Sequence, residues 1–299
     1  ATVENMVIYP HGAAARRPGT QYVAEVKTSS AKTRLIPFEF STTQTYILEL
    51  GNQYIRFYRD NGQILSSGSP YEISSPYLTA ELFDIKFAQS ADVMYVTHPS
   101  HKTRKLSRTG HTSWTLTEVD FTNGPFLDAN VTTTTLTPSA AGTGSRTITA
   151  SAVTGINSGS GFLATDVGRQ IHFNDGYGTI TARTNTTVVT ANITTAFANA
   201  NPITNWYLGA FSDTTGHASC VSFFEQRLVF AATTNNPQTV YFSKSGDYEN
   251  MDANIGGTVA DDDAIIYTIA SNQVNAIRFM ATSRTLIIGT AGGEFTVSG

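Results

Sequence analysis

Two histidines lie close together in this sequence at a spacing that metal sites use. His98 and His101 are three residues apart, a spacing that on a helix would turn both imidazoles toward one cation. Pro99 lies between them, and the flanking residues alternate as strands do, so the pair is expected at the tip of a β-hairpin. No third ligand is evident. The sequence therefore predicts no metal site at these histidines.

The acidic residues offer a second kind of chemistry. Asp261, Asp262 and Asp263 could supply carboxylate ligands to calcium or magnesium. However, consecutive residues of a strand point to alternating faces, and the spaced oxygen ligands of an EF-hand loop are absent. Solvation in a loop, or a contact at an interface, is the better interpretation of this cluster.

A glycosidase would need two carboxylates on opposite sides of a cleft. Glu225, Asp247 and Glu249 are available for that role, but the sequence does not give their separation in space. The segment from Glu225 to Arg227 is better interpreted as the end of a strand, where the arginine pairs with nearby acids.

The remaining candidates favour structural interpretations. The segment from Gly155 to Gly161 lacks the lysine of a phosphate-binding loop and is expected to be flexible. Serine and histidine occur without a nucleophile elbow. Cys220, beside Val221 and Phe223, is typical of a small buried apolar residue. The sequence thus predicts no catalytic, cofactor-binding or metal-binding residue and no cofactor, and it indicates a protein that is not an enzyme.

The elements that would position these residues are strands joined by tight turns. No segment carries a helical apolar stripe over three turns, whereas two-residue alternation recurs on both sides of turn residues. Gly51-Asn52 is expected to form one such turn, since both residue types tolerate positive φ. Hairpins are predicted over residues 46–62, 93–110, 228–246 and 286–299, preceded by short strands over 35–40, 82–87, 219–224 and 274–279.

The four predicted hairpins form a weak repeat. Each closes on a glycine, and the first and last intervals between these glycines are close to the roughly 40–50 residues of a propeller blade. The middle interval is much longer. This pattern favours irregular β-propeller-like blades, incomplete within these residues, while a β-sandwich with long hairpins is the alternative.

The extra length in the middle interval lies between Thr122 and Asp213. Lysine is absent between Lys105 and Lys244, and threonine-rich alternation predicts short strands over 131–136, 146–150, 169–173, 178–182 and 187–191. We therefore expect a small β domain over 123–213, inserted between the blades of 1–122 and those of 214–299.

The composition agrees with an all-β fold and excludes several classes. The chain has 299 residues, 40% of them hydrophobic and 14% charged, which is typical of a globular protein. A net charge of −4 lacks the basic face of a duplex-binding domain, and a single cysteine excludes internal disulfides and multi-cysteine zinc sites. No signal peptide is visible at the start, and the longest charge-free run, 184–212, is too polar for a bilayer.

Strings along the whole chain also carry a family resemblance. They are, in order, Arg16-Arg-Pro-Gly-Thr; Pro37-Phe-Glu-Phe-Ser; Tyr46-Ile-Leu-Glu-Leu-Gly; Tyr54-Ile-Arg-Phe-Tyr; Thr165-Asp-Val-Gly-Arg; Trp206-Tyr-Leu-Gly-Ala-Phe-Ser; Phe224-Glu-Gln-Arg-Leu; Ser243-Lys-Ser-Gly-Asp-Tyr; Asp262-Asp-Ala-Ile; Ser271-Asn-Gln-Val-Asn-Ala-Ile; and Gly289-Thr-Ala-Gly-Gly-Glu-Phe. In this order they resemble the tail nozzle proteins of short-tailed bacteriophages, also called tail tubular protein B or phage stabilisation protein. The matches are weakest in the insert.

The resemblance implies a structural subunit of the virion tail, assembled in the host cytoplasm. Six copies would form a ring, a hexamer, below the portal and adaptor and beside tail fibre or spike proteins, and genomic DNA would pass through without specific binding or any membrane contact. Relatives are longer, so Gly299 resembles a truncation point. Two other functions stay open: a tail-associated carbohydrate-binding or depolymerising propeller, suggested by the aromatics and scattered acids, and an unrelated propeller scaffold for protein partners.

Overall fold

The computed structural model describes residues 4–41, 43–270 and 274–298. Over these residues the chain is all-β, as predicted, and its helical turns are two short 3-10 segments, η1 (Asn157–Gly159) and η2 (Ala164–Asp166). The strands pair antiparallel with their neighbours in sequence, so most sheets are simple meanders. The first three residues of the sequence segment that begins at Ser271 lie outside the described residues, and so does Gly299.

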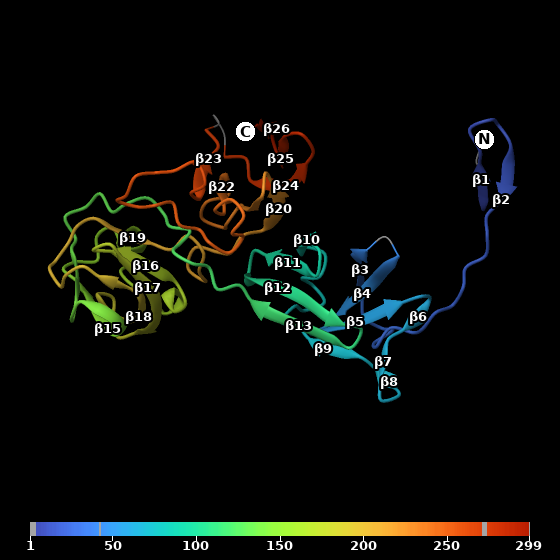
Figure 1. Ribbon diagram of the computed structural model, residues 1–299, viewed down its shortest axis with the longest axis horizontal. Coiled ribbons are helices and arrows are strands. Elements are labelled where there is room, and N and C mark those ends of the chain that lie inside the picture. The colour runs from blue at the N-terminus through green and yellow to red at the C-terminus, as the bar shows by residue number, and fades with distance from the viewer. Residues whose placement is uncertain (1–3, 42, 271–273, 299) are drawn as a thin grey trace.

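Two N-terminal sheets share one core (Figure 1). Phe38, Phe57 and Trp114 meet at its centre, with the Trp114 ring stacked on Phe57 at 4.5 Å and edge-on to Phe38 at 4.8 Å between centroids. The first sheet contains β3 (Arg34–Ser41), β4 (Gln44–Gly51), β5 (Tyr54–Arg59), β6 (Gly62–Gln63) and β9 (Glu72–Ser74), and a small hairpin of β7 (Leu65–Ser66) and β8 (Ser69–Pro70) projects from it. The second contains β10 (Lys86–Ser90), β11 (Val93–His98), β12 (His101–Gly110) and β13 (Ser113–Glu118).

Two local expectations in these sheets are wrong. The β4–β5 turn places its positive φ on Gln53, at 62°, rather than on Gly51 or Asn52. Gly51 is needed for another reason: a β-carbon there would overlap the ring of Tyr54, its partner across the hairpin. The strand expected over 82–87 begins only at Lys86, because residues 81–84 form a turn that buries Leu82 and leads to the buried Ile85.

The six-stranded sheet corresponds to the predicted strand-rich middle segment. It contains β14 (Leu136–Pro138), β15 (Gly142–Ala150), β16 (Gln170–Phe173), β17 (Gly176–Arg183), β18 (Val188–Phe197) and β19 (Trp206–Leu208), in the order β14-β15-β18-β17-β16-β19. The sheet curls, since Leu136 on one edge strand exchanges backbone hydrogen bonds of 2.9 and 3.1 Å with Ile203, just before the other edge strand. It encloses a core of its own. Of the expected 131–136 strand, only Leu136 is in a strand.

Two C-terminal sheets share a further core. The first contains β20 (Cys220–Phe224), β21 (Arg227–Ala231), β22 (Thr239–Phe242) and β23 (Ile265–Thr268), and the second contains β24 (Ile277–Thr282), β25 (Leu286–Thr290) and β26 (Glu294–Val297). Strand β20 packs beside both β24 and β10, so this half of the molecule lies against the N-terminal sheets. The four predicted hairpins are therefore present as β4–β5, β11–β12, β21–β22 and β25–β26.

The N-terminal hairpin stands apart from these sheets. Strands β1 (Met6–Ile8) and β2 (Ala14–Arg16) pair only with each other and project from the body on an extended segment (Figure 1). That segment is fixed at Lys27: its amide donates a 3.2 Å hydrogen bond to buried Glu49, and its ammonium pairs with Glu72 at 2.5 Å. We call residues 4–16 the N-terminal arm.

Candidate functional site

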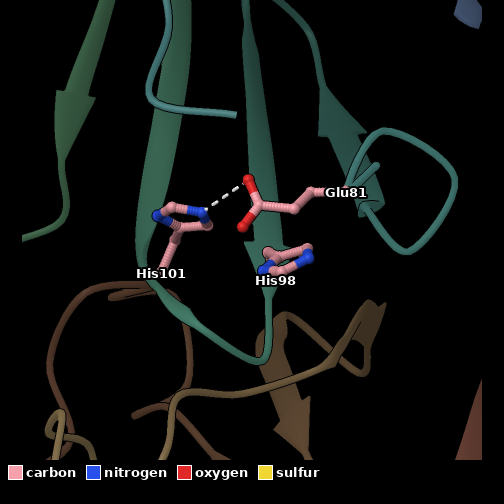
Figure 2. Close-up of side chains that lie close together, drawn as sticks. All are labelled: Glu81, His98 and His101. Carbon is pink, nitrogen blue, oxygen red and sulfur yellow. Dashed lines mark hydrogen bonds and ion pairs between the residues drawn. The ribbon is translucent and has the colours of Figure 1, made fainter. Parts of the chain in front are cut away.

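The structure brings three potential metal ligands together at the tip of the β11–β12 hairpin. Glu81, His98 and His101 each offer one ligand atom, and these atoms lie within 4.8 Å of one another. Figure 2 shows the Glu81 carboxylate reaching over the two imidazoles from a neighbouring loop. Among the described residues this is the one cluster of three or more such side chains. Of the candidate residues considered from the sequence, only the two histidines belong to it.

The two histidines are held in place by the hairpin itself. His98 ends β11, His101 begins β12, and the two are directly paired across the two-residue turn of Pro99 and Ser100. The prediction of a hairpin tip is confirmed. Because paired residues lie on the same face of an antiparallel ladder, the rings come together, with centroids 5.0 Å apart. Tyr77, buried behind them, packs its ring edge-on to His101.

Glu81 is the member of this cluster that the sequence did not indicate. It lies in the turn before β10, which is fixed by buried Leu82 and Ile85 and by Arg34, whose guanidinium donates to both of their carbonyls at 2.8 and 2.7 Å. Its Oε2 accepts hydrogen bonds from the Leu78 amide at 2.8 Å and from His101 Nε2 at 3.0 Å. No local motif marks Glu81 in the sequence, because its approach to the histidines depends on sheet packing.

The electrostatics of the three residues differ. Burial alone would raise the pKa of Glu81, but the Leu78 amide and His101 outweigh it and hold the pKa below its usual value. Burial, reinforced by His101, lowers the pKa of His98, which is 3% exposed. His98 Nδ1 accepts the Ser100 amide at 3.1 Å, whereas its buried Nε2 has no hydrogen-bond partner among the described residues. The site therefore contains a neutral, buried imidazole beside a carboxylate.

The acidic cluster has a structural role. The carboxylate of Asp263 is buried, accepts the Ala260 amide at 2.8 Å and pairs with Lys244 at 2.8 Å; the Lys244 hydrogen bond is the main cause of its lowered pKa. Asp261 and Asp262 are exposed. The cluster is thus a loop, as the sequence favoured, and its three carboxylates do not converge.

Arg227 does not pair with acidic side chains as expected. Its buried guanidinium instead donates to the backbone carbonyls of Ser243, Asp261 and Asp263 at 2.7, 2.5 and 2.7 Å. A planar guanidinium with five N–H donors can satisfy several carbonyls that a loop leaves unpaired. The expectation failed because every residue has a backbone carbonyl, so the sequence does not show which carbonyls a side chain will contact.

The structure places the three glycosidase candidates in different surroundings. Both oxygens of Glu249 accept from the Lys105 ammonium, at 2.7 and 2.8 Å, and Tyr95 donates to the same carboxylate at 3.0 Å. Asp247 accepts from the Asn250 amide at 3.0 Å, and Glu225 lies exposed in the β20–β21 turn.

The segment from Gly155 to Gly161 is tied to a buried ion pair through Asn157. Its Asn157 donates to Asp166 at 2.7 Å and accepts from Arg169 at 2.8 Å, and these two residues form a fully buried ion pair at 2.9 Å. Arg169 also donates to the Gly209 carbonyl, at 2.8 Å. Nothing in the glycine-rich composition signals this arrangement, because its anchors come later in the chain.

Cys220 is buried as expected, with burial as the main cause of a thiol pKa raised to about 11. Such a thiol stays protonated at neutral pH and is unsuited to nucleophilic chemistry.

The comparisons with known proteins do not identify a family. No protein-family model matches the chain, and the search of curated proteins finds no match. Within the described residues, no helix combines the length and the apolar character that crossing a membrane requires.

Proposed function

We propose that this protein is a structural subunit of a bacteriophage tail, similar to the nozzle proteins of short-tailed phages. Six copies would form a ring below the portal and adaptor and contribute to the channel through which DNA leaves the virion. The family resemblance of the strings along the sequence supports this function. The meander sheets on either side of the six-stranded sheet would be propeller-like blades.

The N-terminal arm is the structural feature that best supports a function in assembly. A two-stranded hairpin alone is marginally stable in water, because it has no second layer to cover its apolar side chains. In this arm Met6, Val7, Ile8 and Tyr9 are all exposed, by 43 to 61%. A protein that works as a monomer gains nothing from displaying such a hairpin, whereas a subunit that exchanges arms with neighbours buries it.

A second exposed apolar surface lies on the edge strand β23. All four of its residues are exposed, with Ile265 at 47%, Ile266 at 38% and Tyr267 at 56%. An uncovered apolar edge presents unpaired backbone groups that favour the addition of a strand from another chain. Distinct surfaces at the arm and at β23 suit head-to-tail contacts, which close into rings when the rotation between copies permits.

Mass photometry of the protein mixed with its portal and adaptor tests this function. We expect a defined ring complex for the wild type and loss of that complex for Ile8→Asp, which places a charge on the apolar arm. The matched control is Val131→Asp, at a side chain that is 96% exposed on the body and should tolerate the charge. A wild type that stays monomeric with both partners, or that releases glycan from host envelope, contradicts the proposal.

A further inference from the structure

We propose that Glu81, His98 and His101 bind a divalent zinc ion at the tip of the β11–β12 hairpin. Two imidazoles and one carboxylate form a common protein donor set for zinc, in which water completes four-coordination. Calcium and magnesium prefer sites made of oxygen alone, which this cluster is not. The site does not depend on the proposed tail function.

The geometry requires a small contraction. Ligand bonds of about 2.1 Å around a tetrahedral ion place donor atoms about 3.4 Å apart. Glu81 Oε2 and His101 Nε2 are already 3.0 Å apart, and one ring nitrogen of His98 lies within 4.8 Å of the ligand atoms of the other two residues. The side chains of Glu81 and His101 are 23 and 24% exposed, so they can adjust without disturbing the core, and water has access to the fourth position.

The buried Nε2 of His98 is the independent sign of a ligand. A polar nitrogen without a partner is costly to bury, and this ring is 3% exposed with that nitrogen unpaired within the described residues. The Ser100 amide donates to Nδ1, so the metal-free ring carries its proton on Nε2 with no acceptor. Zinc at Nε2 would replace this unsatisfied N–H by a coordinate bond.

Zinc binding would move a proton within each histidine ring and leave both rings neutral. When Nε2 of His98 binds zinc, the ring proton moves to Nδ1 through solvent, and the Ser100 amide turns to water, which is feasible because Ser100 is exposed. At His101, the Nε2 proton that now bonds Glu81 likewise moves to Nδ1. Both rings stay neutral, and the single carboxylate leaves one positive charge on the ion, in a site open to solvent.

The role of the ion would be to tie the turn around Glu81 to the hairpin tip. At this tip the Pro99 carbonyl also accepts a 3.1 Å hydrogen bond from the His217 amide. The tip therefore joins the N-terminal sheets to the segment that leads into β20. Because zinc would bind the folded state in preference to the unfolded chain, it should stabilise this junction by an amount that grows with the logarithm of its affinity.

Calorimetric titration of Zn²⁺ into chelator-treated protein tests the proposal, with Glu81→Gln and His101→Gln as the ligand variants. We expect each variant to weaken binding at least about tenfold, since each loses a direct ligand. The control is His111→Gln, at a histidine that contacts Tyr46 and Arg59 instead of the cluster, and its affinity should equal that of the wild type. Circular dichroism of each variant establishes that it is folded.

Two further measurements on the wild type keep the test independent of the variants. Zn²⁺ should raise the melting temperature, and bound Co²⁺ should give the intense visible absorption of a four-coordinate site. A wild type that shows neither effect contradicts the proposal, as does Zn²⁺ affinity that is unchanged in both ligand variants or lowered equally in His111→Gln.

Discussion

At the scale of single residues, three buried histidines link stability to pH. Burial is the main cause of a lowered pKa at His98, His172 and His217. In the unfolded chain each titrates near 6.5, so below that pH the unfolded state binds more protons than the native state, and stability falls. We expect the melting temperature to decrease steadily from pH 7 to pH 5.

This pH dependence can be assigned to individual rings. His217→Gln should give a shallower decrease, because one titrating group is removed, whereas His11→Gln, on the exposed arm, should keep the wild-type slope. Differential scanning calorimetry across this pH range provides the comparison. A flat profile for the wild type would show that the histidines titrate alike in both states.

The buried ion pair of Asp166 and Arg169 predicts a large stability effect. Asp166→Ala would leave an uncompensated guanidinium that is 1% exposed, and we expect a loss of about 3–5 kcal/mol. Asp128→Ala, at an exposed carboxylate, is the control and should change stability by less than about 0.5 kcal/mol. Urea unfolding measures both, and equal losses would contradict the role assigned to the pair.

Residue-level prediction from the sequence failed where contacts are distant in the chain. Cys220 was predicted correctly, because its apolar neighbours in the strand already indicate burial. Glu81 was missed, since only the packing of its turn against β11 and β12 brings it to His101. Glycine in the β25–β26 turn does not by itself indicate a left-handed backbone: neither Gly292 nor Gly293 has positive φ, and a β-carbon at Gly292 would meet the Asn275 side chain.

At the scale of elements, local alternation predicted the hairpins well, because each hairpin is stabilised by neighbours in sequence. The curl of the six-stranded sheet could not be predicted in this way. It depends on the pairing of Leu136 with Ile203 and on the Trp206 indole, which donates to the Thr134 carbonyl at 2.9 Å, and both contacts cross most of the segment.

The predicted insert boundaries can be tested by excision. Phe126 and Gly209 are paired in an antiparallel bridge, so their backbones are close enough for a short Gly/Ser linker to replace residues 127–208. We expect this variant to keep its β signal and a cooperative melt in circular dichroism.

A wider excision, of residues 124–212, serves as the comparison. Removing 124–212 also removes Phe211, whose ring packs against Phe230 and Tyr241 in the flanking core, so the melt should come at lower temperature. An insoluble or molten product from both excisions would show that the middle segment is needed for the rest to fold.

At the scale of the whole molecule, four of the 19 lysine and arginine residues lie on the single strand β12. The basic side chains of β12 are each paired: Lys102 and Arg104 with Glu118, Lys105 with Glu249, and Arg108 with Asp92. Lys102 and Arg104, two residues apart, share one strand face, and Glu118 on β13 lies beside both. A phosphate would have to displace these carboxylates before it could bind.

We therefore expect no measurable duplex binding at physiological salt in fluorescence anisotropy. Glu118→Gln should reveal weak binding at low salt, because it frees two cations, and Glu225→Gln, in an exposed turn, should not. Micromolar affinity of the wild type with a steep salt dependence, lost in the double variant Lys102→Gln and Arg104→Gln, would contradict a passive channel wall.

The fixing of Lys27 on Glu49 and Glu72 sets a limit on distances between molecules. Only residues 17–26 separate this fixed point from Arg16 at the end of β2, and the eleven residue steps from Arg16 to Lys27 span at most about 40 Å when fully extended. The base of the hairpin must therefore lie within that distance of Lys27 on its own copy. In the proposed assembly, the length of this connecting segment would limit the arm to copies that stand close to its own.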